Sequence, residues 1–553
     1  MCVIKRVFIC MKKETILRQN NLFLFDIDFL LCYTKYGEVM DIIIIGAGPA
    51  GLATAYQLLK QNKKLKVTIL EESDSVGGIS KTVRHNGNRM DLGGHRFFTK
   101  NEDVEKLWFK IMPLQGHPAY DDKILGTNKK FTGKKDPEKD DNVMLVRNRI
   151  SRIFYKHKFF DYPVSLNAKT IKNMGFITTM KCGFSYIHAS IFKKEESNLE
   201  NFYINRFGNE LYNMFFKGYT TKLWGRTPSE IDSSWGSQRV KGISIRKVLI
   251  DYYKRLFHIK NKNKETSLIE SFYYPKYGPG ELYEEMAKQI EKMGGKILLN
   301  SKVIKIKKSK DNIESVTYEN NKKKVTVTCD KLVSSMPVKD LINDMNSVPK
   351  HISKISNDLP YRDFITIGVL VPKLDLKNET NIKTIHNNIP DNWIYIQDTT
   401  VKMGRIQIFN NWSSYMVKDP INTIWIGLEY FCSEGDAFWN LKDEDLVKLA
   451  KRELKKMGFY DGKLLDSKVV KVKKAYPAYF DSYDHIGEVR EYINGINNLY
   501  CVGRNGTHSY NNMDHSILSG MICADLILKN SHDLDKLWNV NVDKSYHEEK
   551  VNN

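Results

Sequence analysis

The sequence predicts an α/β fold, in which a nucleotide-binding domain on a parallel sheet is interrupted by a mainly helical segment and an antiparallel-sheet segment. Three observations predict it. A glycine-rich turn follows a β-branched apolar run near residue 45, and similar short apolar runs return near residues 333 and 500. The stretches between them show helical periodicity first and strand alternation later. The chain has 553 residues and 41% hydrophobic content, enough for about two to four domains with buried cores.

The first strand is followed by three glycines at the G-x-G-x-x-G spacing. Ile42–Ile45 is short, apolar and β-branched, as in a parallel strand buried on both faces. Gly46 permits a tight turn, Gly48 lets backbone approach a pyrophosphate, and Gly51 lets the next helix pack closely on the strand. The start of that helix offers unpaired N–H groups to phosphates. An ordinary βαβ turn with coincidental glycines is the alternative.

The next strand supplies the context that a lone glycine motif lacks. Lys66–Glu71 predicts a second strand, and Glu71 at its end lies 20 residues after Gly51, where an acidic residue would bind ribose hydroxyls. Gly77 and Gly78 follow directly. We therefore expect a dinucleotide site here.

A second strand–turn–helix unit lies far downstream. Leu499–Val502 predicts a strand, Gly503–Gly506 a turn, and residues 512–528 a helix. A simple NAD dehydrogenase does not need this second contact, whereas a long flavin spanning the domain does. The strand predicted at Lys331–Ser335 likewise returns the chain to the first domain.

The pattern divides the chain into several segments. Residues 115–145 are rich in Lys, Asp, Asn and Gly, and we expect a mobile loop or an insertion there. Met40 directly precedes the first strand, which makes the preceding residues a separate extension. We expect residues 1–39 as an extension that is disordered or a misassigned start, residues 40–110, 270–340 and 471–530 as the discontinuous nucleotide-binding domain, residues 111–269 as a mainly helical substrate domain with the Lys-rich loop, residues 341–470 as an antiparallel-sheet substrate domain, and residues 531–553 as a tail.

Composition indicates which partners and which cellular location to expect. The net charge is +21, but the lysines mix with Asn and Asp as on a solvated face, so we expect no nucleic-acid partner. The eight cysteines form no CxxC pair and no disulfide framework, which favours a reducing, cytoplasmic location and gives no sign of a metal site. No apolar run reaches the length of a membrane helix, so we expect no integral membrane segment.

Taken together, these motifs resemble the flavoprotein superfamily of amine oxidases, protoporphyrinogen oxidases and UDP-galactopyranose mutases. The resemblance covers about residues 40–530 and implies a Rossmann-type, glutathione-reductase-like FAD-binding domain with inserted substrate domains. The residues that it places on FAD are Gly46, Gly48, Gly51, Glu71, Gly77, Gly78, Gly94, Val303, Gly503, Arg504 and Met513.

Further blocks look closer to the mutases. Gly93–His95 is similar to the segment that holds a histidine against the flavin ring, and Tyr219–Gly225 resembles the motif that contacts uridine. The resemblance implies a catalytic set of His95, Arg239, Arg405, Tyr430 and Tyr510, and a substrate-binding set of Tyr219, Trp224 and Asn512. Asn512 departs from the family, since many mutases carry Asp there. Taken alone, His95 reads equally well as a structural histidine and each arginine as half of a surface ion pair.

The resemblance implies a reaction as well as a fold. A mutase interconverts the pyranose and furanose forms of a UDP-sugar through reduced FAD without net redox, as in cell-surface polysaccharide biosynthesis. It must keep FAD reduced, which leaves an external reductant such as NAD(P)H open. The alternative is an FAD-dependent oxidoreductase of the amine oxidase or protoporphyrinogen oxidase type, which would need an apolar cage over the flavin. A third reading is a basic nucleic-acid-binding protein with a relic cofactor site. The oligomeric state stays undetermined.

Overall fold

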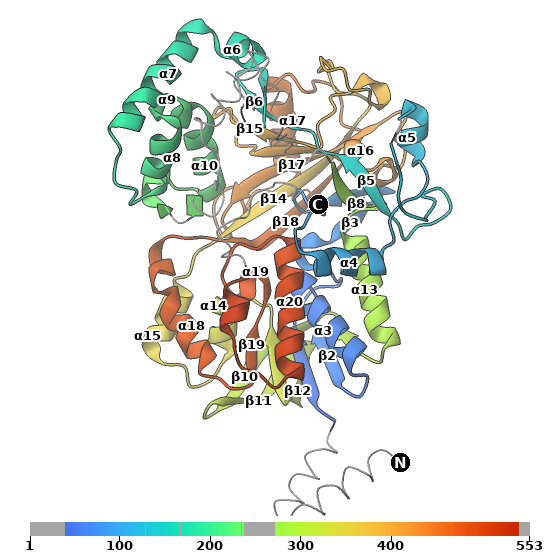
Figure 1. Cartoon of the computed structure of the whole chain (residues 1–553), viewed down its shortest axis with the longest axis vertical. Helices are drawn as coiled ribbons and strands as arrows, with labels where there is room; N and C mark the ends of the chain where they lie inside the picture. The colour runs from blue at the N-terminus through green and yellow to red at the C-terminus, as the bar shows by residue number, and fades with distance from the viewer. Residues whose placement is uncertain are drawn as a thin grey trace, which may run out of the picture.

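The computed structural model describes residues 39–540, except residues 128, 163, 165–167, 234 and 237–270 and the side chain of residue 386. The predicted extension before residue 39 and the predicted tail beyond residue 540 therefore lie outside the described residues. Figure 1 shows β2, α3 and α20 at one end of the molecule, and a second sheet and a lobe of helices at the other end.

A five-stranded sheet forms the centre of the first end. Its order is β19-β13-β1-β2-β9, and all neighbouring strands are parallel. The central strands are apolar and buried on both faces, as expected for a parallel sheet. The bounds are Asp41–Ile45 (β1), Lys66–Leu70 (β2), Lys296–Leu298 (β9), Lys331–Ser334 (β13) and Leu499–Cys501 (β19). The predicted α/β class with a Rossmann-type domain is confirmed.

Helices α3 (Pro49–Gln61), α13 (Gly280–Lys292) and α20 (Met513–Leu528) share one hydrophobic core with this sheet. Helix α20 lies directly against α3, because a Cβ at Gly520 would stand 2.3 Å from the carbonyl oxygen of Ala50. The last helix of the described fold is thereby fixed to the helix that starts at the glycine motif (Figure 1).

The other face of the parallel sheet carries a three-stranded antiparallel sheet. This sheet consists of β10 (Ser301–Ser309), β11 (Asn312–Asn320) and β12 (Lys323–Thr328). The Ser301 amide donates to the carbonyl of Glu71 at 2.7 Å, so β10 begins beside the end of β2. Three further helices pack on this side: α14 (Val338–Asp344), α15 (Lys350–Asn357) and α18 (Ile486–Asn494).

The second end of the molecule is built on a seven-stranded sheet of order β18-β14-β17-β16-β15-β6-β7. We expected an antiparallel sheet, but β6 pairs parallel with β15, so the sheet is mixed. Strands β6 and β7 come from the segment that we expected to be mainly helical. The bounds are Ser151–Tyr155 (β6), Lys158–Asp161 (β7), Tyr361–Val371 (β14), Trp393–Ile396 (β15), Arg405–Ile408 (β16), Ile424–Cys432 (β17) and Asp466–Pro477 (β18).

A buried ion pair explains how β6 joins this sheet. The Arg152 guanidinium donates Nε and Nη2 to the Asp391 carboxylate at 2.9 and 2.6 Å. The side chain of Asp391 is fully buried and that of Arg152 is 8% exposed. The neighbouring Asn392 side chain accepts from the Ile150 amide at 2.8 Å. These bonds join residues about 240 positions apart, which local sequence patterns do not reveal.

The helical lobe beside this sheet has an aromatic core. Its helices begin at Ala168 and continue to Trp224, as expected from the helical periodicity of the segment. Aromatic side chains such as Phe202 and Tyr203 fill the space between them. The bounds are Ala168–Met174 (α6), Phe176–Ile191 (α7), Leu199–Phe207 (α8), Asn209–Tyr212 (α9) and Gly218–Trp224 (α10).

Residues 115–145 differ from the expected mobile loop. They contain helix α5 (Tyr120–Leu125) and a buried carboxylate, Asp122, that lies 2.7 Å from Lys129 and 3.7 Å from Arg147. Burial alone would raise the pKa of Asp122, but the two cations hold it below the usual value. The lysine-rich composition therefore serves internal ion pairing here.

We expect the Asp391→Ala substitution to destabilise the fold by about 3–5 kcal/mol, because it leaves the Arg152 charge buried without a partner. Chemical denaturation followed by circular dichroism measures the loss. The matched control is Glu314→Ala, which breaks an exposed pair with Lys307 and should leave the midpoint nearly unchanged. Equal midpoints for the two variants would show that the Arg152–Asp391 pair does not hold β6 in place.

Candidate functional site

The glycine motif forms a backbone cradle between β1 and α3. Gly46 has φ +97°, and a Cβ there would stand 2.2 Å from Ser335 Oγ. A Cβ at Gly51 would lie 2.0 Å from the Gly46 carbonyl oxygen. Across the cradle, a Cβ at Gly78 would come within 3.3 Å of the Gly48 Cα. Apart from Ser335 Oγ beside Gly46, the atom nearest to each of these positions belongs to the backbone, which suits a pyrophosphate at a helix N-terminus.

Glu71 stands at the end of β2 beside this cradle. Its Oε2 accepts from the Ala47 amide at 2.7 Å, and its Oε1 accepts from the Ser73 amide at 2.9 Å. Oε1 also accepts from Ser73 Oγ at 2.7 Å, so Oε2 is the oxygen with a lone pair left for a further donor, as a ribose hydroxyl would provide. The amides of Ala47, in the glycine turn, and of Ser73 therefore hold the Glu71 carboxylate beside the cradle.

The downstream unit closes on the same cradle. Gly503 has φ +73°, and its Cβ would stand 2.9 Å from the Ala50 Cβ. Its amide donates to Ser519 Oγ of α20 at 3.0 Å. The predicted turn at residues 503–506 is a single helical turn, α19, and Met513 is the first residue of α20. Val303 lies in β10, largely buried in the core on the far face of the sheet.

A buried ion pair lies where the two sheets meet. Arg405 in β16 is directly opposite Glu429 in β17, and its Nε and Nη2 donate to Glu429 Oε2 at 2.8 and 2.5 Å. Gln407 donates to the other oxygen of Glu429 at 2.7 Å. Glu429 is fully buried, whereas the side chain of Arg405 is 16% exposed. Burial would lower the pKa of Arg405, but Glu429 keeps it above its usual value.

His95 lies beside this ion pair in the Gly93–His95 turn. A Cβ at Gly93 would lie 3.5 Å from His95 Cε1 and 4.0 Å from Arg405 Nη2. Burial, followed by the charges of Arg504 and Arg405, lowers the pKa of His95 to about 3. The imidazole is therefore neutral at physiological pH. Among the described residues, its buried Nδ1 has no hydrogen-bond partner.

Arg504 brings a second cation to the same place. Its Nε and Nη2 donate to the Asn511 carbonyl at 2.8 and 2.6 Å, and its Nη1 donates to the Ala475 carbonyl at 2.9 Å. No carboxylate pairs with it within the part of the chain that the structure describes. The guanidinium lies over the rings of Tyr510 and Tyr476, 4.7 and 5.6 Å from their centroids. The site therefore has an excess positive charge.

Aromatic side chains border these cations. Tyr476 and Tyr510 are stacked at 6.3 Å, and Tyr219 of α10 approaches Tyr395 and Phe431 edge-on at 5.6 and 6.3 Å. All five are partly exposed, so they line an accessible surface above the buried Glu429 and Gln407. The structure thus brings together Gly94, His95, Tyr219, Arg405, Arg504 and Tyr510.

Two of the predicted residues, Tyr430 and Trp224, lie elsewhere. Tyr430 points to the opposite face of β17 from Glu429, into the core that faces α17 (Asp443–Lys456), and lies beside Glu453. Its expected place at the substrate is therefore wrong, because side chains alternate along a strand. Trp224 packs between Trp235 and Phe480 in the helical lobe. Asn512 is exposed at the start of α20, next to the Asn511 carbonyl that accepts from Arg504, so it borders the site. Arg239 lies outside the described residues.

Sequence reasoning missed Tyr476 and Gln407. Tyr476 lies in β18, whose lysine-rich sequence lacks the apolar runs by which the other strands were predicted. Gln407 is two residues after Arg405 and shares its face of β16, which the strand period of two could have indicated.

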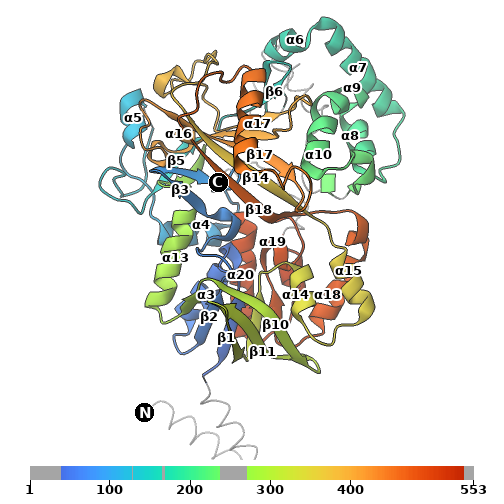
Figure 2. The same ribbon diagram turned by 180° about the vertical axis from the view of Figure 1, so that it is seen from behind.

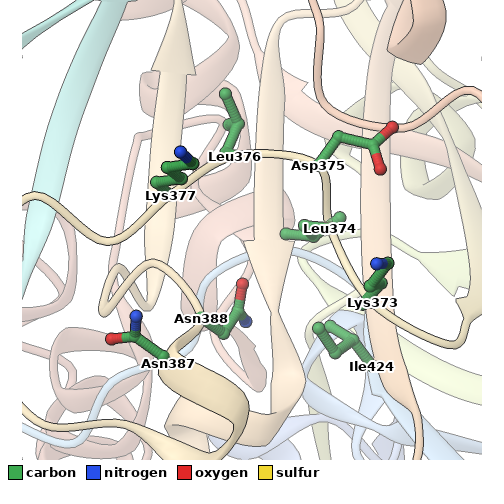
Figure 3. A pocket seen from close by; sticks show the side chains of 8 residues that line it. All are labelled: Lys373, Leu374, Asp375, Leu376, Lys377, Asn387, Asn388 and Ile424. Atoms are coloured by element: carbon green, nitrogen blue, oxygen red, sulfur yellow. The ribbon is translucent and has the colours of Figure 1, made fainter.

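A separate cavity of about 200 Å³ lies near the junction of β14 and β17 (Figure 3). It is lined by the loop Lys373–Lys377, by Asn387 and Asn388, and by Ile424. None of the residues predicted for cofactor or substrate lines it. It does not contribute to the candidate site.

The part of the chain that the structure describes has neither a metal cluster nor a membrane-spanning helix. No cluster of three His, Cys, Asp or Glu side chains could hold a metal ion there. None of the helices in the described ranges has the length and apolar character needed to cross a bilayer.

Comparison with known proteins identifies the family. Residues 49–528 match the profile of the flavin containing amine oxidoreductases. A "Probable UDP-galactopyranose mutase" of Klebsiella pneumoniae is 29% identical over 203 residues, which are 35% of this chain and 43% of that protein. The matched region thus spans less than half of that relative.

Solved structures agree on the fold. A reduced UDP-galactopyranose mutase superposes with a TM-score of 0.72 at 19% identity, covering 92% of this chain and 99% of that chain. A putrescine oxidase variant superposes with a TM-score of 0.54 at 12% identity, covering 89% and 99%. Since the family match runs through both sheets and the helical lobe, the chain belongs to the family of flavin-containing amine oxidoreductases.

Proposed function

We propose that the protein is an FAD-dependent mutase that interconverts the pyranose and furanose forms of a UDP-sugar. The observation that carries this proposal is the pair of cations at the junction of the two sheets, one of them without a carboxylate partner in the described chain. An anionic diphosphate fits such a site, and a neutral amine or polyene does not need it. The similarity to UDP-galactopyranose mutases supports the same substrate class.

The chain's own residues fit FAD. The bare backbone at Gly46, Gly48 and Gly78 would accept the pyrophosphate, Glu71 the ribose, and the end of α19 and the start of α20 the ring system. Gly77, Gly94, Val303 and Met513 are proposed neighbours of the cofactor. When bound, a reduced flavin supplies a nucleophile for the sugar, which no side chain of the site offers. The Arg504 cation would favour the electron-rich, reduced form of a bound flavin.

The substrate would lie on the aromatic surface. Arg405 uses Nε and Nη2 on Glu429, which leaves Nη1 to donate to a diphosphate oxygen. Glu429 thereby aims the guanidinium and fixes its charge. Tyr219 and Tyr510 would contact the nucleotide, and we propose Arg239 as a second diphosphate arginine. Because His95 is neutral near pH 7, its ring can form a hydrogen bond to a ligand. It cannot act as a cationic general acid at that pH.

An oxidoreductase is the second candidate. The pairing of Arg405 with Glu429 removes much of one positive charge, and the five aromatic side chains would also enclose an apolar substrate. The family name and the putrescine oxidase likeness agree with this reading. The two candidates differ in their use of oxidant.

We expect pure protein to be yellow, and the Gly48→Val substitution to abolish flavin retention, because a branched side chain would occupy the space facing Gly78. Absorbance near the flavin bands, relative to protein absorbance, measures occupancy. The matched control is Gly487→Val on α18, where a Cβ meets nothing within 4 Å. Colourless wild-type protein that takes up no added FAD would contradict the cofactor proposal.

The mutase proposal predicts isomerisation without net oxidation. With anaerobic dithionite-reduced protein, UDP-galactopyranose should yield the furanose form, detected by chromatography, and the oxidised protein should be inactive. An oxidoreductase would instead consume oxidant in proportion to turnover. Stoichiometric hydrogen peroxide from an amine or porphyrinogen, with no isomerisation of any UDP-sugar, would establish the second candidate.

We expect Arg405→Ala to weaken UDP binding by about ten- to a hundred-fold, because a charge-assisted hydrogen bond is worth roughly 1.5–3 kcal/mol. Arg405→Lys should restore only part of the affinity, since an ammonium cannot both pair with Glu429 and reach the diphosphate. Because alanine also leaves Glu429 buried without its cation, thermal melting checks that each variant is folded before calorimetric titration with UDP measures the loss. Flavin content per folded protein should not change. The control is Arg84→Ala, whose side chain forms an exposed pair with Glu284. Wild-type UDP affinity in both Arg405 variants would remove the arginine from the substrate site.

A further inference from the structure

Helix α7 of the helical lobe turns its large apolar side chains outward. Of the 13 large hydrophobic residues exposed in the described ranges, six lie on this one helix, between 44% and 75% exposed. At about 100° per residue they form a single stripe roughly 100° wide. They are Phe176, Ile177, Met180, Phe184, Ile187 and Ile191.

The inward face of the same helix carries small residues. Cys182 and Ala189 are buried there, where α7 lies against α8 and α9. A Cβ at Gly208 would stand 2.7 Å from the Tyr186 amide nitrogen, so the backbones touch. The helix cannot rotate to bury its stripe without losing this close contact. The outward orientation is therefore a fixed feature of the lobe.

The charges on α6, on α7 and directly after α7 are positive, and the exposed Glu195 and Glu196 follow them. Residues 162–194 contain five lysines and neither Asp nor Glu. Lys181 lies on α7, and Lys193 and Lys194 follow its end and are exposed. Lys169 and Lys172 lie on the adjoining helix α6. An apolar stripe bordered by lysines is the pattern of a helix that lies in a lipid–water interface.

We propose that α6 and α7 dock this protein on an anionic lipid bilayer, with the α7 stripe inserted among the acyl chains and the lysines at the headgroups. Charge complementarity selects this occupant. In a symmetric contact with a second copy, the same five lysines would face their own counterparts. A bilayer containing acidic lipids attracts them instead.

The arrangement in space agrees with this mode. Figures 1 and 2 show α6 and α7 at the outer edge of the molecule, at the opposite end from the parallel sheet of the nucleotide-binding part. The 16 residues of α7 are too few to span a bilayer, so the helix would lie in the plane of the interface.

Vesicle co-sedimentation of the full chain tests the proposal. We expect binding to phosphatidylcholine vesicles with about 30% phosphatidylglycerol, little binding to pure phosphatidylcholine, and weaker binding at about 0.5 M NaCl. The triple variant F176S/F184S/I191S should lose at least about tenfold in partitioning. The matched control I382S/L465S removes exposed apolar side chains elsewhere and should bind like wild type. A second variant, K181Q/K193Q/K194Q, should lose binding to the anionic vesicles while keeping the stripe.

Melting temperature and light scattering test whether the α7 stripe is covered by something other than a bilayer. The serine variant should melt like wild type and keep its oligomeric state. No binding of wild type to the anionic vesicles would overturn the proposal. A dimer that the serine substitutions dissociate, or a lowered melting temperature without vesicle binding, would overturn it in favour of a second copy or of residues 237–270, which lie outside the described residues.

Discussion

The candidate site depends on one buried carboxylate. Glu429 is fully enclosed, and an unpaired carboxylate there would be strongly unfavourable, so Arg405 and Gln407 must both face it. This requirement fixes the register of β16 against β17 and holds a guanidinium at the surface of the sheet. From there the Arg405 charge helps to lower the pKa of His95, which belongs to the other half of the molecule. The electrostatics of the site thus arise from a constraint within the second sheet.

The sequence was most informative where backbone geometry is local. Gly46 and Gly51 predict their own turn, because only glycine allows the φ angle of Gly46 and the close backbone contact at Gly51. The short strands β1, β13 and β19 could also be predicted locally, because a parallel strand that is buried on both faces must be apolar throughout. These features sufficed for the fold class.

The remaining features of the fold and the site depended on long-range contacts, or on which of two neighbouring residues faces the site. Glu429 and Tyr430 are neighbours, and only the pairing of β17 decides that Glu429 faces Arg405 and Tyr430 faces α17. The parallel pairing of β6 with β15 depends on a bond between Arg152 and Asp391, which no local pattern contains. The lysine-rich residues 115–145 misled because composition does not reveal that Asp122 is buried between cations.

Strand β18 has a consequence for how the two halves of the molecule communicate. It places the Tyr476 ring on the substrate side and, one residue earlier, offers the Ala475 carbonyl that holds Arg504. In the proposed enzyme, a ligand that shifts Tyr476 would also shift the cation that favours the reduced flavin. Ligand affinity and reduction potential would then be thermodynamically linked, and by reciprocity the redox state would change the affinity for the ligand by the same factor.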